Sequence, residues 1–130
     1  MLPSPATLAR ALKGKSVSIK AALLDQRVVA GLGNIYAAEA LHRAGISPKR
    51  RASTLATAAG EPRPQAVALV EAIRATLKDA IAHSHRMYGD DRFRVYDHEG
   101  ERCHRRGCAG TIKRIVQAGR STFFCPVCQR

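Results

Sequence analysis

The sequence predicts a mainly α fold in which a helical bundle is followed by a small β-hairpin that carries four cysteines. Three observations support this prediction. Apolar residues recur at three- and four-residue steps over Pro64–Ser84, which is the helical period. Short segments of alternating character flank Ala118-Gly119-Arg120, as expected of two strands joined by a turn. All four cysteines of the 130-residue chain lie after residue 102, close to those predicted strands.

Capping residues mark the predicted helix boundaries. Serine and asparagine cap helix N-termini, proline suits the first turn, and glycine commonly follows the last turn. The longest helix is the best defined, because Leu69, Ile73 and Leu77 lie on one apolar stripe. The predicted helices are Pro5 to about Gly14 after a Ser4 cap, Ile19–Gln26 after a Ser18 cap, Asn34–Ala44 between an Asn34 cap and Gly45, a short turn capped by Ser53, and Pro64–Ser84.

Patterns typical of strands follow the helical part. Phe93 and Val95 alternate with polar residues and predict a short strand. Thr111–Gln117 and Ser121–Cys125 predict two further strands, with the turn at residues 118–120 between them.

The cysteines form two close pairs whose spacing is typical of a zinc site. The pattern is C-x4-C, sixteen intervening residues, then C-x2-C, formed by Cys103, Cys108, Cys125 and Cys128. Each pair can present two thiolates from one turn, and the hairpin brings the pairs together around a tetrahedral ion. A closed shell leaves no position for water, so we expect one structural Zn²⁺ that stabilises the hairpin. The fold class is then mainly α with a small β zinc finger, divided into a helical domain, residues 1–90, and a zinc-finger β-hairpin, residues 91–130.

Other uses of these cysteines are less well supported by the sequence. Two disulfides would suit a secreted protein, but Met1–Lys20 lacks the apolar core of a signal peptide. The Cys125-Pro126-Val127-Cys128 segment lacks the βαβ setting of a redox pair, and iron–sulfur clusters use other spacings. His104 is a possible substitute ligand, although four thiolates already complete the shell.

The charge of the chain indicates a polyanionic partner. Lys and Arg outnumber Asp and Glu by 22 to 10, which gives a net charge of +12. In residues 101–130 only Glu101 opposes seven cations, namely Arg102, Arg105, Arg106, Lys113, Arg114, Arg120 and Arg130. A solvated basic face or a lipid-binding patch is the alternative, but clustered charge favours nucleic-acid phosphates. The apolar runs are too short to cross a bilayer, so we expect no membrane partner and a cytoplasmic, bacterial, nucleoid-associated protein.

Two glycines before the third helix suggest an anion site. Gly31-Leu32-Gly33-Asn34 does not continue as a dinucleotide-binding fingerprint, because Tyr36 occupies the third glycine position. The glycines still allow a ligand to approach the backbone, and the helix start offers free N–H groups. A glycine hinge with a helix cap is the alternative without a ligand. Arg120, flanked by Gly119 and Ser121, is similarly suited to a phosphate.

Two parts of the chain resemble formamidopyrimidine-DNA glycosylases. The helix–two-turns–helix module of that family is resembled by Ser18-Ile19-Lys20, Leu24-Asp25-Gln26, Val29-Ala30-Gly31-Leu32-Gly33-Asn34-Ile35-Tyr36, Glu39-Ala40-Leu41 and Ala44-Gly45-Ile46-Ser47-Pro48. The family's zinc finger is resembled by Gly119-Arg120-Ser121-Thr122-Phe123-Phe124-Cys125-Pro126-Val127-Cys128-Gln129. The two motifs occur in the family's order and cover nearly the whole chain.

The resemblance implies a role in base-excision repair of DNA and a set of contact residues. Lys20 and Asn34 match family residues that hold backbone phosphates around the lesion, with Gly33 at the turn between the helices. Arg120 matches the finger arginine that contacts phosphates and is assigned a catalytic role in δ-elimination. Lys15 lies where family members carry a DNA-facing lysine. The family flips a damaged purine out of the duplex, cleaves its glycosidic bond and nicks the abasic site.

Two departures from the family pattern affect the expected chemistry. Family catalysis begins at an N-terminal proline followed by glutamate on a β-sandwich domain, whereas this sequence opens Met1-Leu2-Pro3-Ser4. We therefore expect the N-terminal catalytic domain to be absent and the chain to be inactive as a glycosylase by itself; a separate catalytic domain is a possible partner. Family members also carry a longer glycine-rich loop where this chain has only His83–Arg92, which weakens the expectation of base-specific lesion recognition.

Three functions follow from these observations. The first is a binding module for damaged or abasic duplex DNA, dependent on backbone phosphates. The second is an abasic-site lyase in which Arg120 or a lysine promotes strand cleavage. The third is an RNA-binding or ribosome-associated zinc module.

Overall fold

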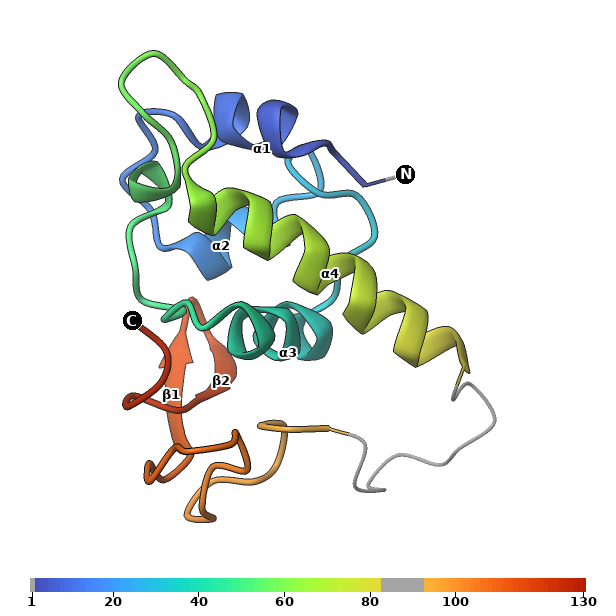
Figure 1. The fold of residues 1–130 in the computed structure, drawn as a ribbon, viewed down its shortest axis with the longest axis vertical. Coiled ribbons are helices and arrows are strands. Elements are labelled where there is room, and N and C mark those ends of the chain that lie inside the picture. The colour runs from blue at the N-terminus through green and yellow to red at the C-terminus, as the bar shows by residue number, and fades with distance from the viewer. Residues whose placement is uncertain (1, 83–92) are drawn as a thin grey trace.

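A computed structural model describes residues 2–82 and 93–130 of the chain. Its elements are the helices α1 (Pro5–Leu12), α2 (Ile19–Leu24), α3 (Asn34–Ala44) and α4 (Pro64–Ala82), the 3-10 helix η1 (Ala52–Leu55), and the strands β1 (Lys113–Gln117) and β2 (Arg120–Phe124). The helices form one body, and the hairpin lies beside α3 close to the C-terminus (Figure 1). The predicted fold class, mainly α with a small β-hairpin, is confirmed.

Serine caps begin the first two helices as predicted. The Ser4 side chain accepts from Thr7 N–H at 3.2 Å, and the Ser18 side chain accepts from Ala21 N–H at the same distance. Each bond satisfies a donor that the first helical turn leaves without a partner. The second helix is shorter than predicted and ends at Leu24, because Asp25 adopts an extended conformation. The short turn begins at Ala52, one residue before the predicted Ser53 cap.

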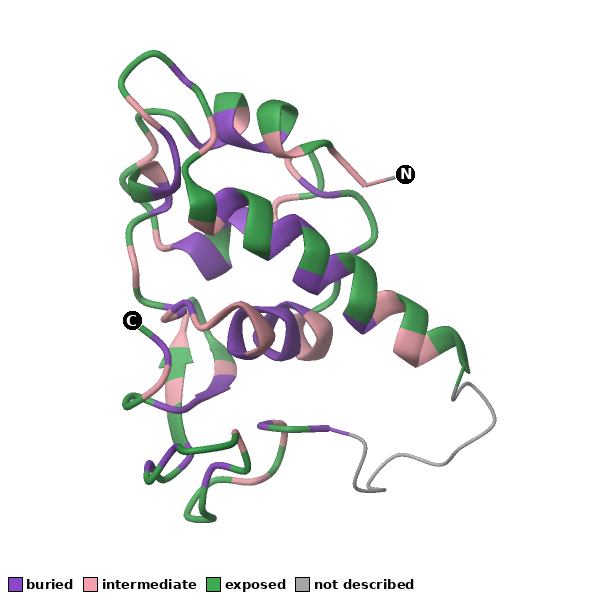
Figure 2. Cartoon of the chain, viewed as in Figure 1, coloured by how far each residue is buried: buried purple, intermediate pink, exposed green. Residues whose placement is uncertain are grey.

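Helix α3 lies at the centre of the structure. It packs against α2, α4 and β2, and most of its residues are buried (Figure 2). Its apolar residues serve two cores, since Ala37 and Leu41 join the core of the helical part while Ala38 joins the core of the hairpin. The helix ends as predicted at Gly45, whose φ of 73° places it in the left-handed region that glycine tolerates.

The hairpin forms from a two-residue turn. Ala118 and Gly119 have φ of 49° and 78°, and two positive φ values match the turn type whose twist suits a hairpin. The turn is therefore one residue shorter than predicted, and Arg120 begins β2 opposite Gln117.

The strand predicted at Phe93 and Val95 is wrong. The buried carboxylate of Glu39 on α3 accepts three backbone N–H groups from this segment: Arg94 at 2.7 Å, Val95 at 3.0 Å and Tyr96 at 2.9 Å. A side chain thus provides the acceptors that a partner strand would have provided.

Other predictions concern residues outside the described part of the chain. The predicted end of the longest helix at Ser84, the boundary between residues 90 and 91, and the short His83–Arg92 connection all fall there. Among the helices of the described residues, none combines the length and apolar character needed to cross a bilayer.

Candidate nucleic-acid interface and zinc centre

Lys20 is a buried lysine that joins α2, α3 and β2. Its side chain is 1% exposed, and its Nζ donates to Asn34 Oδ1 at 2.6 Å and to Thr122 Oγ1 at 2.5 Å. The Ser121 carbonyl lies 3.4 Å from the same nitrogen. The ammonium group therefore has a partner on α3 and two on β2, although more than 100 residues separate Lys20 from that strand.

Two cations meet at this point without an acidic partner. Burial, and secondly the positive charge of Arg120, lower the pKa of Lys20 to about 8. No carboxylate within the described residues forms an ion pair with Lys20 or Arg120. A bound anion would relieve the repulsion between the two side chains, so the geometry favours an anionic ligand here.

Asn34 differs from its predicted role as a helix cap. Gly33 is the N-cap of α3, and the Asn34 side chain instead accepts from Lys20 and donates Nδ2 to the Ser121 carbonyl at 3.0 Å. Among residues 2–82 and 93–130, no side chain caps this helix end, and no atom lies within 4 Å of the position that a Cβ on Gly33 would occupy. The first N–H groups of α3 thus have no side-chain cap within the described residues, and this helix end lies next to Lys20, which donates to Asn34.

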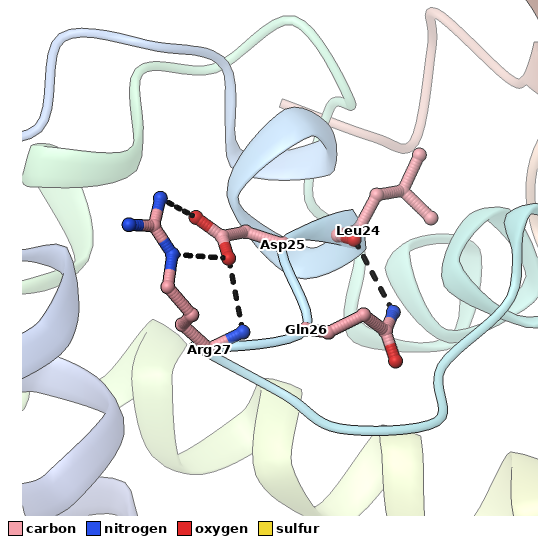
Figure 3. Close-up of polar contacts among 4 residues, drawn as sticks. All are labelled: Leu24, Asp25, Gln26 and Arg27. Carbon is pink, nitrogen blue, oxygen red and sulfur yellow. Dashed lines mark hydrogen bonds and ion pairs between the residues drawn. The ribbon is translucent and has the colours of Figure 1, made fainter.

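Polar contacts fix the connection that leads to this helix start. Figure 3 shows the Asp25 carboxylate accepting three hydrogen bonds from Arg27, one from its backbone N–H at 2.9 Å and two from its guanidinium at 3.0 and 2.9 Å. These hydrogen bonds, with the charge of Arg27, hold the pKa of Asp25 at about 2. Gln26 donates to the Leu24 carbonyl at 3.3 Å and accepts from Gly31 N–H at 2.6 Å, so both ends of the turn are held in place.

The other two predicted DNA-contact residues, Arg120 and Lys15, differ in how they relate to Lys20. Arg120 is exposed at the start of β2, near enough to influence the lysine electrostatically. Lys15 lies in the connection between α1 and α2, where its carbonyl accepts from Ser53 N–H. No hydrogen bond joins its side chain to Lys20 or Asn34 within the described residues, and its charge contributes instead to the low pKa of Asp25.

The four cysteines form one cluster of free thiols. Their sulfur atoms all lie within 4.8 Å of one another, and the members are Cys103, Cys108, Cys125 and Cys128. A tetrahedral ion with Zn–S bonds of about 2.3 Å separates its ligands by roughly 3.8 Å. The Cys103–Cys128 and Cys108–Cys125 sulfur pairs are 3.9 and 3.6 Å apart, which fits that geometry and excludes disulfides.

The environment of the thiols favours a divalent cation. Burial raises the pKa of the Cys128 thiol to about 12, because a lone thiolate is poorly solvated there. A metal ion reverses this preference by stabilising the thiolates. The backbone is shaped around the sulfurs as well, since a Cβ on Gly110 would lie 2.5 Å from Cys125 Sγ.

Several polar residues of these sites were missed in the sequence. Thr122 binds Lys20, Glu39 anchors the segment after residue 92, and the His42 ring lies 3.3 Å from Cys103 Sγ. The strand period places Thr122 on a definite face, but nothing local indicates a lysine 102 residues away. His104, the predicted substitute ligand, is exposed and is not among the clustered metal-binding groups of the described residues.

Comparisons with known proteins give the same two modules. Residues 4–90 match the formamidopyrimidine-DNA glycosylase H2TH domain, where H2TH denotes helix–two-turns–helix. Residues 100–130 match the zinc finger found in FPG and IleRS, so a zinc finger and a four-cysteine site able to hold one Zn²⁺ coincide. The predicted structural zinc is thereby confirmed.

Individual relatives extend the match over almost the whole chain. The chain is 60% identical to formamidopyrimidine-DNA glycosylase of Rhodopseudomonas palustris (strain HaA2) over 136 residues, covering 95% of this chain and 46% of that protein. The enzyme of the same name from Beijerinckia indica is 57% identical, with 96% and 48% covered. The chain thus spans about half the length of the curated relatives it matches.

Solved structures agree with this assignment. The Lactococcus lactis Fpg in complex with abasic-site DNA has a TM-score of 0.81 at 35% identity, covering 100% of this chain and 52% of that chain. The MutM (Fpg) protein of Thermus thermophilus has a TM-score of 0.80 at 37% identity, covering 99% and 53%. The resemblance seen in the sequence is confirmed, and the chain belongs to the formamidopyrimidine-DNA glycosylase family through its H2TH domain and its zinc finger.

Proposed function

We propose that the chain binds damaged or abasic duplex DNA through backbone phosphates, as the DNA-binding and zinc-finger part of a base-excision-repair glycosylase and abasic-site lyase. The observation that carries the proposal is the pair of cations, Lys20 and Arg120, without an acidic partner in the described residues, beside the free N-terminus of α3. A net charge of +12 supports a polyanion as the ligand. The Lactococcus lactis relative was solved with abasic-site DNA.

Each predicted contact residue has a distinct role in this proposal. Lys20 attracts one phosphate to the start of α3 through the charge of its buried ammonium, Asn34 positions that ammonium, and Gly33 leaves room for the DNA backbone to approach. Arg120 binds a neighbouring phosphate from the zinc-supported hairpin, and its predicted role in δ-elimination belongs to the lyase reaction of the family. Lys15 contacts DNA farther along the helical surface. Zinc is assigned to the four clustered thiolates of Cys103, Cys108, Cys125 and Cys128.

Fluorescence anisotropy with a duplex that contains an abasic-site analogue tests DNA binding. Affinity should fall steeply with salt, because each phosphate contact releases condensed counterions from the DNA. Each contact adds about −0.9 to the slope of log affinity against log salt concentration. Arg120→Ala should weaken binding and lower that slope by about one. Lys78→Ala is the matched control, because it removes one exposed positive charge from α4. Equal effects of the two variants, or an affinity indifferent to salt, would refute the proposed interface.

Borohydride trapping on abasic DNA separates binding from lyase chemistry. An imine requires an accessible neutral amine. The pKa of Lys20 is favourable for this chemistry, but the residue is 1% exposed and its amine already donates to Asn34 and Thr122. We therefore expect no covalent adduct on Lys20. An adduct lost in Lys20→Met would assign the lyase function to this residue instead.

Competition between duplex DNA and structured RNA tests the alternative of an RNA- or ribosome-associated module. The proposed function requires DNA to compete at least as well as RNA at equal salt.

The proposed location of the protein rests on the same ligand. Because chromosomal DNA is the proposed ligand, we propose that the protein acts in the bacterial cytoplasm with the nucleoid.

A further inference from the structure

His42 is a buried histidine at the end of α3 whose ring reaches the zinc cysteines. Its side chain is 1% exposed, and its Nε2 lies 3.3 Å from Cys103 Sγ and 3.9 Å from Cys128 Sγ. The four clustered sulfurs already form a complete tetrahedral set without this ring. The imidazole therefore lies directly outside the metal coordination shell.

The chemistry of that shell determines what the ring can do. Four thiolates around one Zn²⁺ carry a net charge of about −2 and offer only hydrogen-bond acceptors. A ring nitrogen facing a bound thiolate must therefore carry hydrogen and act as the donor. The 3.3 Å separation makes Cys103 the nearer acceptor, while Cys128 is more distant.

Arg105 is a second residue of the zinc finger that contacts His42. His42 Nδ1 and Arg105 Nε are both buried and lack a hydrogen-bond partner within the described residues. With hydrogen on Nε2, Nδ1 is an acceptor, and Arg105 Nε is a donor. The two residues are already in contact, since Arg105 Nη2 donates to the His42 carbonyl. Arg105 thus contacts His42 and retains a buried donor, while the ring with hydrogen on Nε2 retains a buried acceptor.

Positive charge gathers on the same side of the metal site. A cavity of about 290 Å³ is lined by His42, Arg94, His104, Arg105 and Arg106. Three of these residues belong to the loop between Cys103 and Cys108. Glu39 and Asp79 act electrostatically on Arg94, and a dianionic zinc–thiolate centre would add negative charge next to these cations.

We propose that His42 is a positioning residue of the zinc centre, which donates its Nε2–H to the Cys103 thiolate and ties α3 directly to the metal. Hydrogen bonds to metal-bound ligands orient them and strengthen metal binding. Helix α3 is then fixed at both ends, because Asn34 at its start binds the β2 backbone and His42 in its last turn binds the zinc finger. Zinc binding thereby stabilises the position of the proposed phosphate-binding helix start as well as the hairpin.

Zinc transfer from the intact chain to a colorimetric chelator tests this role. His42→Phe keeps a flat buried ring but removes the donor, and it should release zinc at least about tenfold faster. His42→Gln places an amide nitrogen the same number of bonds from Cβ as Nε2, so it should restore much of the retention. The matched control is His104→Phe, which removes a neighbouring exposed imidazole and should release zinc like the parent.

A direct measurement distinguishes a hydrogen bond from simple packing. In protein loaded with ¹¹³Cd instead of zinc, the His42 Nε2 proton should show scalar coupling to the metal through the Cys103 sulfur. Nitrogen NMR should also find the hydrogen on Nε2. Hydrogen on Nδ1 in the parent, or equal zinc retention by His42→Phe and the parent, would overturn the proposal. Neither result depends on DNA binding, so the proposed function is tested separately.

Discussion

Lys20 is expected to make DNA binding sensitive to pH near 8. Its ordinary pKa of 10.5 is lowered to about 8, first by burial and then by the charge of Arg120. As the pH rises above 8, the ammonium loses its proton and its attraction for a phosphate. If DNA binds only the protonated form, affinity falls roughly tenfold by about pH 9 and roughly thirtyfold by about pH 9.5. An ordinary lysine would lose only a few per cent of its charge at about pH 9.

Anisotropy titrations from about pH 6.5 to 9.5 at constant ionic strength measure this effect. In Lys20→Met the fall between pH 8 and 9.5 should disappear, although binding is weaker throughout. In Arg120→Ala the fall should move to higher pH, because one cause of the low lysine pKa is removed. Parent affinity that stays constant to pH 9, or a pH dependence preserved in Lys20→Met, would contradict the reasoning.

Deprotonation of Lys20 also affects the stability of the fold, but stability should rise with pH where DNA affinity falls. The folded state releases the Lys20 proton near pH 8, whereas the unfolded state holds it to about 10.5. Between these values the unfolded state binds more protons, so the free energy of unfolding rises with pH. Denaturant unfolding gives the free energy of unfolding of the parent and of Lys20→Met at each pH. Only between pH 8 and 10.5 should this free energy change differently with pH in the two proteins.

Three further predictions concern the zinc finger and its attachment. Gly110→Ala should weaken zinc binding, measured by chelator competition, because the new Cβ collides with Cys125 Sγ; a metal affinity equal to that of the parent would contradict this. Glu39→Gln should destabilise the protein by about 1–3 kcal/mol in urea unfolding, since the amide cannot accept all three N–H groups of residues 94–96. Unchanged hydrogen exchange at those amides would disprove that role. Removing zinc with a chelator should abolish the β1–β2 signals in NMR spectra and leave the helical circular dichroism largely intact, whereas a hairpin unaffected by metal loss would show that zinc is not structural.

Local chemistry in the sequence was sufficient for the starts of the first two helices and for the metal site. Ser4 and Ser18 cap helices because their hydroxyls bond N–H groups only three residues away. The spacing of the cysteines predicted the zinc finger, since two pairs joined by a hairpin converge without help from the rest of the chain. The resemblance to the glycosylase family then indicated Lys20, Asn34 and Arg120 as one group, of which the structure directly joins the first two.

Contacts between distant segments had to come from the tertiary structure. Glu39 replaced the strand predicted at Val95, because a carboxylate on α3 reached backbone donors 55 to 57 residues later in the chain. Asn34 was predicted as a helix cap, but its side chain binds Lys20 because the fold brings α2 and α3 together. The burial of Lys20 and the position of His42 beside the thiolates also require α3 to lie between the helical core and the hairpin. Sequence spacing determines local hydrogen bonds and metal pairs, whereas the pKa of a lysine or the partner of a histidine depends on which segments the fold brings together.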